Sequence, residues 1–259
     1  MKLHTRVRGQ GPDLVLLHGW GMNEVVWSAI VPNLAERHRV TLVELPGHGG
    51  SDYDPAWNSL ESWASACLEV MPKHADWIGW SLGGHLALRA ALDAPHRVRK
   101  LLLVNSSPRF VKGPGWPHAV DEPTLRQFSV ALRRNHQQTL ARFLSLQVQG
   151  DEAARESLRL LRSDLIASPE PHPKALEQGL DLLLDVDLRD QLPHLRCPCL
   201  WLLGERDTLV PAGVAEDLAR MSIPDSRVRI LRGCAHAPFI SHPVESLEAL
   251  NSFIGVQND

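Results

Sequence analysis

The feature that most constrains the fold is the stretch Trp-Ile-Gly-Trp-Ser-Leu-Gly-Gly at residues 77–84. A short apolar segment leads directly into Ser81, and a helical apolar pattern begins at once and continues to about Ala94. Gly79 and Gly83 stand two residues before and two residues after Ser81. A serine held between a strand and a helix takes a strained backbone conformation, and only very small neighbours fit beside it. The spacing therefore predicts a sharp turn that places the Ser81 hydroxyl at a helix N-terminus, where negative charge is favoured. The alternative is an ordinary glycine-rich turn.

Composition excludes several classes of protein. The chain has 259 residues, 44% of them hydrophobic and 22% charged, and its net charge of −3 gives no general attraction to nucleic acid or anionic membranes. No apolar run reaches the length of a membrane span, and residues 1–6 carry no apolar signal segment. The pair Cys197 and Cys199 lacks the partners of a zinc site, so the four cysteines are expected to be free buried thiols. We expect a cytoplasmic monomer with no nucleic-acid or membrane partner.

Strand-like segments alternate with helical patterns along most of the chain. The expected strands are residues 3–8 at an edge, 13–17, 40–44, the segment before Ser81, 100–105, 199–203 and 228–231. The expected helices are residues 24–37, 60–70, the helix after Ser81, 214–221 and 244–254. Nearly continuous apolar strands that alternate with helices predict a mostly parallel sheet covered on both faces.

The alternation stops after residue 108. Residues 109–187 contain no convincing strand, and helical patterns are expected within residues 125–146, 153–166 and 176–184. We therefore expect residues 1–108 and 188–259 to form the core and residues 109–187 to form an inserted helical lid. The insertion begins where a strand ends, and ligands bind at the carboxyl ends of strands in open α/β sheets.

Three polar residues follow three different expected strands. Ser81, Asp207 and His236 stand in the order serine, acid, histidine, so all three are expected at one edge of the sheet. A serine hydroxyl is a poor nucleophile without a base to take its proton and a group to orient that base. In this interpretation Asp207 fixes the tautomer of His236, and His236 activates Ser81. The alternatives are a simple turn aspartate, a loop histidine, and His242 as a rival base.

Two backbone N–H groups are candidates to stabilise an oxyanion. One belongs to Leu82, directly after the serine, and the other to Trp20, in the turn His-Gly-Trp-Gly at residues 18–21. Trp20 can also serve simply in packing. His18 is expected to brace this turn, and residues 46–51 form a structural turn because the Lys-Ser/Thr of a phosphate loop is missing.

The expected lid carries an unusual charge. Between residues 126 and 162 the formal charge is +4, which leaves −7 on the remainder of the chain. The seven arginines of this segment are Arg126, Arg133, Arg134, Arg142, Arg155, Arg159 and Arg162. A solvated helix face is the simpler explanation, but the asymmetry and the absence of lysine favour a docking surface for an acidic or phosphate-bearing partner.

The chain resembles the α/β-hydrolase superfamily along its whole length. Four motifs narrow this resemblance: residues 18–21, residues 79–84, the run Arg-Phe-Leu-Ser-Leu-Gln at 142–147, and residues 235–243. Together they are similar to the BioH-type carboxylesterases of biotin synthesis, which hydrolyse the methyl ester of pimeloyl-acyl-carrier protein. The resemblance implies an α/β-hydrolase fold with a mostly parallel central sheet, helices on both faces and a helical lid insertion.

The resemblance also implies roles for individual residues. Ser81, Asp207 and His236 would form the catalytic triad, and the amides of Trp20 and Leu82 would form the oxyanion hole. The acyl channel would be lined by Phe143, Leu144, Ser145, Leu146 and Gln147. The arginines that grip the carrier protein would be Arg142, Arg155 and Arg159. A further arginine of the family is replaced by Gln138, for which Arg134 lies one turn earlier. No metal or organic cofactor is implied.

Two other functions stay open on the sequence alone. The same fold serves esterases, thioesterases and C–C hydrolases that act on free small molecules. A non-catalytic ligand receptor on this fold is the alternative of another class, although the complete Ser81, Asp207 and His236 set argues against it.

Overall fold

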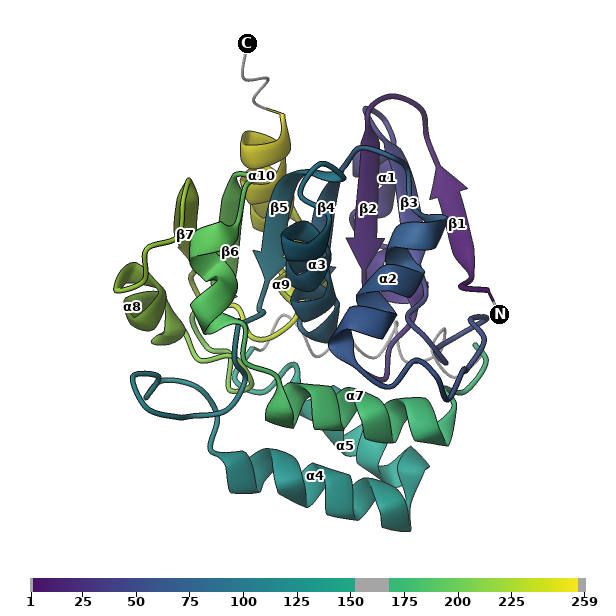
Figure 1. Ribbon diagram of the computed structural model, residues 1–259, viewed down its shortest axis with the longest axis vertical. Coiled ribbons are helices and arrows are strands. Elements are labelled where there is room, and N and C mark those ends of the chain that lie inside the picture. Colours follow the sequence, from purple (N-terminus) through teal and green to yellow (C-terminus); the bar gives the residue numbers. More distant parts are fainter. Residues whose placement is uncertain (1, 152–167, 256–259) are drawn as a thin grey trace.

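A central sheet of seven strands organises the protein (Figure 1). The computed structural model describes residues 2–151 and 168–255. The strand order across the sheet is β1-β3-β2-β4-β5-β6-β7, with β1 antiparallel to β3 and every other neighbouring pair parallel. The strands are β1 (Thr5–Arg8), β2 (Asp13–Leu17), β3 (Arg39–Val43), β4 (Ala75–Trp80), β5 (Val98–Val104), β6 (Cys199–Gly204) and β7 (Ser226–Leu231).

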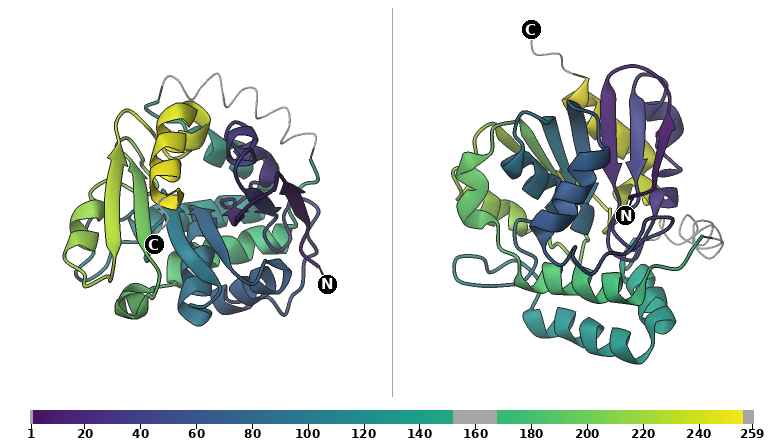
Figure 2. Two further views of the ribbon diagram at one scale, coloured as in Figure 1. Left: turned by 90° about the horizontal axis from the view of Figure 1, so that it is seen from above. Right: turned by 45° about the vertical axis from the view of Figure 1, so that its right-hand side comes forward.

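Helices cover both faces of this sheet (Figures 1 and 2). The short α1 (Val31–Leu34) and the closing α10 (Pro243–Ile254) lie on one face, and α2 (Leu60–Val70) and α3 (Leu82–Asp93) lie on the other. Every residue of β4 and β6 is buried, as expected for strands covered on both sides. This arrangement confirms the predicted fold class. The remaining short elements are η1 (Glu24–Trp27), η2 (Arg189–His194), α8 (Val214–Ala219) and α9 (Pro238–Ser241).

One predicted helix is wrong in extent. Residues 24–37 were expected to form a continuous helix, but the structure has the 3₁₀ turn η1 followed by the four-residue α1. Pro32 stands at the start of α1. Proline has no N–H to donate to the preceding turn, so the helical hydrogen bonding is interrupted there and a new helix begins.

Three further helices pack together across the carboxyl ends of the parallel strands (Figures 1 and 2). They are α4 (Glu122–Arg134), α5 (His136–Leu146) and α7 (Pro173–Asp185). Asn135 separates the first two, because it ends α4 and its side chain accepts the N–H of Gln138 at 3.0 Å to cap α5. The helix expected over residues 153–166 lies outside the described residues. None of the helices that the structure describes is long and apolar enough to span a membrane.

Candidate active site

Ser81 occupies a strained turn between β4 and α3. Its backbone has φ 55° and ψ −120°, a conformation that residues with a side chain rarely adopt. The turn is fixed from both sides: the Ser81 N–H donates to Val104 O at 3.0 Å, and the Ser81 carbonyl accepts the hydroxyl of Ser106 at 2.8 Å. Local strain of this kind persists only where the surrounding structure imposes it, and it is concentrated at functional sites.

The glycines around Ser81 are required by close backbone contacts. A Cβ on Gly79 would overlap the carbonyl group of Gly83, and a Cβ on Gly83 would overlap the carbonyl oxygens of Leu17 and His18. The spacing of the two glycines thus reflects steric contact at the turn, as the sequence indicates. The second contact also brings the Ser81 turn against the turn that contains Trp20.

Asp207 and His236 form a buried pair at the ends of neighbouring strands. The Nδ1 of His236 lies 2.7 Å from Oδ2 of Asp207, and both side chains are at most 1% exposed. The other carboxylate oxygen, Oδ1, accepts the N–H groups of Leu209 at 2.7 Å and Val210 at 3.0 Å. Since an ionised carboxylate only accepts, it holds the proton on Nδ1 and leaves Nε2 as the basic nitrogen.

The imidazole of His236 lies beside the strand that carries Ser81. The indole N–H of Trp80 donates to the carbonyl oxygen of His236 at 2.8 Å, and the two rings are 5.5 Å apart. Within the described residues Nε2 is buried without a hydrogen-bond partner. No hydrogen bond to the Ser81 hydroxyl is recorded, and such bonds often tighten only when substrate binds. The rival His242 instead places its Nδ1 at 2.8 Å from Ser241 Oγ.

Asn105 is a residue that the sequence analysis missed. It follows β5 with a positive φ of 41° and is completely buried. Its side-chain amide donates to the carbonyl of Ala235 at 2.8 Å, and its oxygen accepts the N–H of Gly204 at 2.6 Å. It therefore links the strand end before Asp207 to the loop of the histidine. The only signal in the sequence was the asparagine itself at the end of an expected strand, because asparagine tolerates a positive φ better than most residues do.

The two predicted oxyanion donors lie in the adjoining turns. In the described part of the chain the backbone N–H groups of Trp20 and Leu82 make no recorded hydrogen bond, and both residues are buried. The indole N–H of Trp20 donates to Leu176 O of α7 at 2.8 Å, and its ring meets Phe143 of α5 edge-on at 4.8 Å. The Trp20 turn is therefore packed directly against the helices that cover the strand ends.

Two buried histidines brace the Trp20 turn. His18 accepts the N–H of Leu45 on Nε2 at 3.0 Å, and its Nδ1 donates to Gly19 O at 2.8 Å. His48 accepts the N–H of Gly21 on Nε2 at 3.1 Å. Burial, together with the neighbouring His48, lowers the pKa of His18 to about 3, and burial lowers the pKa of His48 to about 4. Both rings are neutral at pH 7, which suits the bracing role expected for His18.

The five consecutive residues expected to line an acyl channel do not share one environment. Phe143, Leu144 and Gln147 are buried, Leu146 is partly buried, and Ser145 is exposed with its hydroxyl bonded to Ala141 O at 2.9 Å. A helix turns about 100° per residue, so a continuous run cannot face one cavity. Both polar atoms of the Gln147 amide are buried and have no partner among the described residues.

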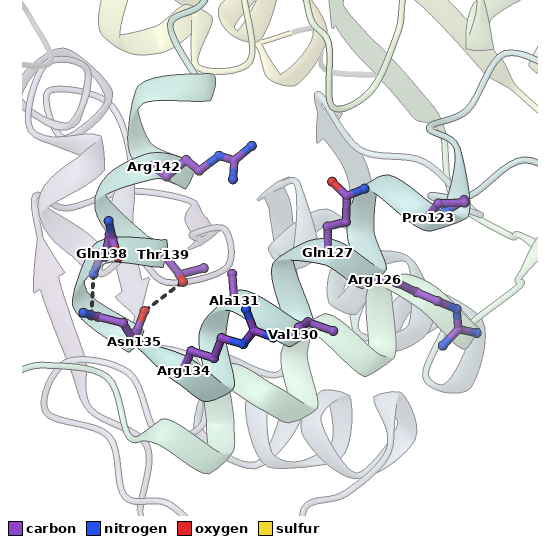
Figure 3. A pocket seen from close by; sticks show the side chains of 10 residues that line it. All are labelled: Pro123, Arg126, Gln127, Val130, Ala131, Arg134, Asn135, Gln138, Thr139 and Arg142. Atoms are coloured by element: carbon purple, nitrogen blue, oxygen red, sulfur yellow. Dashed lines mark hydrogen bonds between the residues drawn. The ribbon is translucent and has the colours of Figure 1, made fainter.

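Arginines surround a groove between α4 and α5 (Figure 3). The groove has a volume of about 770 Å³. Arg126 and Arg134 reach it from α4 and Arg142 from α5, and the guanidinium of Arg142 lies 5.5 Å from the ring of Phe128. The expected docking residues Arg155 and Arg159 lie outside the described residues, as does Arg162.

The described residues contain no group of three or more His, Cys, Asp or Glu side chains arranged to hold a metal ion. All four cysteines are free and buried. Burial raises the pKa of the Cys67 thiol to about 12, so Cys67 is not a nucleophile at neutral pH.

Comparison with known proteins gives a consistent result. A family model described as "alpha/beta hydrolase fold" matches residues 12–243. A "Pimeloyl-[acyl-carrier protein] methyl ester esterase" of Photobacterium profundum is 45% identical over 249 residues, covering 96% of this chain and 97% of the relative. The protein of the same name from Xanthomonas axonopodis pv. citri is 44% identical, covering 97% and 98%. Among solved structures, an esterase from Exiguobacterium antarcticum has a TM-score of 0.86 at 24% identity, covering 98% of this chain and 96% of its own.

Proposed function

Because this chain belongs to the α/β hydrolase fold family, and within it to the family of its pimeloyl-[acyl-carrier protein] methyl ester esterase relatives, we propose that it is a serine carboxylesterase of biotin synthesis. Its reaction is hydrolysis of pimeloyl-acyl-carrier protein methyl ester to pimeloyl-acyl-carrier protein and methanol. The observation that carries this proposal is the strained turn at Ser81 beside the buried pair of Asp207 and His236.

The chemistry follows from these groups. The Ser81 oxygen attacks the ester carbonyl carbon while Nε2 of His236 takes the hydroxyl proton. The amides of Trp20 and Leu82 hold the oxyanion, and Asp207 stabilises the imidazolium. His236 then protonates the departing methoxide, which leaves as methanol, and an acyl-Ser81 ester remains. Water attacks that ester with His236 again as base, and the carboxylic acid is released as the serine is restored.

We assign acyl recognition to the inner surface of the segment 109–187, acting as a lid. Phe143 meets Trp20, the proposed oxyanion residue, and Leu144 is buried next to Phe143 on α5, so both side chains can supply apolar contact. The amide of Gln147, which has no partner among the described residues, adds a polar contact, since a buried amide without a partner costs free energy that a substrate oxygen or a water would offset. Ser145 is not assigned to this surface because it is exposed.

We further propose that the groove between α4 and α5 takes part in docking the carrier protein. Arg126, Arg134 and Arg142 are exposed around it, and Val130 at the groove is 45% exposed. Arg126 is ion-paired with Glu122 at 2.5 Å, so Arg134 and Arg142 are the main cations of this proposal. An apolar spot flanked by these arginines suits an acidic helix, because the charges steer the encounter and the apolar contact holds it. Arg134 would then compensate for Gln138. Arg155 and Arg159 stay part of this docking proposal, as do a cytoplasmic location and a monomeric state.

The first experiment tests the ester hydrolysis. A fluorophosphonate probe is expected to label the protein, and Ser81→Ala is expected to abolish both labelling and turnover of p-nitrophenyl acetate. Ser252→Ala is the matched control, because the Ser252 hydroxyl lies on α10 and donates to Ala249 O of the same helix at 2.9 Å. Turnover that persists in Ser81→Ala would refute the mechanism.

The second experiment tests the substrate. The gene is expected to restore growth without biotin to a bacterial host that lacks its own pimeloyl ester esterase, and Ser81→Ala is expected to fail. If growth is not restored although p-nitrophenyl acetate is hydrolysed, the protein is an esterase of free small molecules. If neither activity is found, the non-catalytic receptor becomes the better account.

A further inference from the structure

The peptide groups on either side of Ala235, directly before His236, are held by two side chains from distant parts of the chain. The carbonyl of Ala235 accepts the amide N–H of Asn105 at 2.8 Å, from the end of β5. The N–H of Ala235 donates to Oδ2 of Asp151 at 3.3 Å, from the segment that follows α5. We call Asn105, Ala235 and Asp151 the Ala235 clamp.

The backbone of His236 is held in the same way. Its N–H donates to Gln147 O at 3.0 Å, and its carbonyl accepts the indole N–H of Trp80 at 2.8 Å. All four backbone polar groups of Ala235 and His236 therefore have partners outside their own loop. Two of these partners come from the strand ends of the core, and the other two come from residues 147–151.

Residues 147–151 also contact the loop of the acid. The guanidinium of Arg206, next to Asp207, donates to Gly150 O at 2.7 Å. Gln147, Gly150 and Asp151 thus join the end of α5 to both loops of the acid–base pair. Movement of this segment would therefore be transmitted to both loops.

Asp151 is an unusual residue in this position. It is only 2% exposed, although burying a carboxylate is unfavourable unless hydrogen bonds or a counter-charge offset the loss of water. Its partners include the Ala235 N–H and, at 3.5 Å, Nδ1 of His242. These two groups belong to the loop and turn that carry the base.

We propose that Asp151 and Asn105 are positioning residues that fix the imidazole of His236 through the backbone of Ala235. Asn105 holds this backbone from the core of the protein. Asp151 holds it from the segment 147–151, so the position of the His236 imidazole depends on the position of that segment. This inference rests on the proposed function, because it assumes that His236 is the base. A displacement of about 1 Å in a catalytic group can lower the rate by about 10²-fold, so loss of one hydrogen bond to this backbone has a measurable effect.

The test separates the acceptor at position 151 from its charge. Asp151→Asn keeps an oxygen that accepts the Ala235 N–H, whereas Asp151→Ala removes it. With p-nitrophenyl acetate, which is too small to need the acyl channel, Asp151→Ala is expected to lower kcat about tenfold with KM within about twofold. Asp151→Asn is expected to recover kcat to within about threefold of the wild type. Asp185→Ala removes an exposed carboxylate from the end of α7 and is the matched control.

Three results would overturn the inference: an unchanged kcat in Asp151→Ala, an equal loss in Asp151→Asn, or a change confined to KM. Asn105→Gly adds an independent check, because glycine accepts the positive φ at this position while both side-chain hydrogen bonds are lost. If both residues act through Ala235, the double variant loses less activity than the product of the two single losses. A loss equal to that product would show that the two residues act independently, which contradicts the Ala235 clamp.

A failure of the inference is distinguishable from a failure of the proposed function. Wild-type protein without turnover or probe labelling refutes the esterase proposal and the inference with it. Wild-type turnover with an insensitive Asp151→Ala refutes the inference alone. If Asn105→Gly does not fold, the two Asp151 variants alone test whether position 151 positions His236. Asp151 lies outside the central sheet, so its substitution leaves the strands intact.

Discussion

Acidification is expected to destabilise this protein steeply, because three histidines are completely buried. Burial lowers the pKa of His18 to about 3, of His48 to about 4 and of His85 to about 4, from an ordinary value of 6.5. Below pH 6.5 the unfolded chain binds protons at these positions while the native protein does not. The free energy of unfolding therefore falls as the pH falls from 6.5 to about 4, and it reaches its plateau above 6.5.

The magnitude follows from the size of the pH step. At pH 5 each histidine is about 1.5 pH units below its unfolded pKa and still above its native pKa, which costs about 2 kcal/mol per residue. The three together cost about 6 kcal/mol, a large share of the 5–15 kcal/mol that is typical of a folded domain. Asp187 does not contribute here: its hydrogen bonds to Arg189 and Arg109 outweigh the cost of its burial and lower its pKa to about 2, so its stabilisation is lost only below pH 4.

Urea unfolding monitored by the fluorescence of the eight tryptophans measures this dependence. The free energy of unfolding is expected to fall by about 6 kcal/mol between pH 7 and pH 5. His85→Gln is neutral at every pH and retains a donor for Pro108 O, which His85 contacts at 3.2 Å, so it is expected to reduce the dependence by about one third. Equal stability at pH 7 and pH 5, or a His85→Gln protein with the wild-type pH dependence, would refute this reasoning.

Three other predictions test the turn, the acid and the docking groove. Gly79→Ala places a methyl group on the backbone of the Ser81 turn and is expected to cost about 3 kcal/mol in urea unfolding; a cost below 1 kcal/mol would contradict the contact. Asp207→Asn no longer holds the proton on Nδ1 of His236 and is expected to lower kcat about 10³-fold or more, measured with p-nitrophenyl acetate. Arg134→Glu is expected to lower kcat/KM about tenfold on carrier-bound ester and not on free dimethyl pimelate, with the exposed Arg37→Glu as control; equal effects on both substrates would exclude docking.

The parts of the fold that follow from short-range sterics could be predicted from the sequence. The turn at Ser81 is one example, because the contact of Gly79 with Gly83 lies within five residues. The helix over residues 24–37 was predicted too long, since its apolar spacing outweighed Pro32 in the interpretation. The lid boundaries at residues 109–187 stay a prediction.

Contacts between distant segments could not be predicted. Asn105 and Asp151 meet Ala235 only because β5, the segment after α5 and the loop of the histidine converge in the folded chain. Nothing in the local pattern around either residue indicates a partner 130 or 84 positions away. For Ser145 the prediction was too broad. The resemblance covers the continuous run 143–147, which includes residues on the exposed face of the helix as well as residues on its buried face.

The most direct test of the central claim is the covalent intermediate itself. The protein is mixed with carrier-bound pimeloyl methyl ester, quenched in acid within milliseconds and digested for peptide mass spectrometry. The account predicts a pimeloyl group attached to Ser81, formed together with a burst of methanol, and none in Ser81→Ala. Methanol release at the full rate with no acyl group on Ser81, or with the acyl group on another residue, would contradict it.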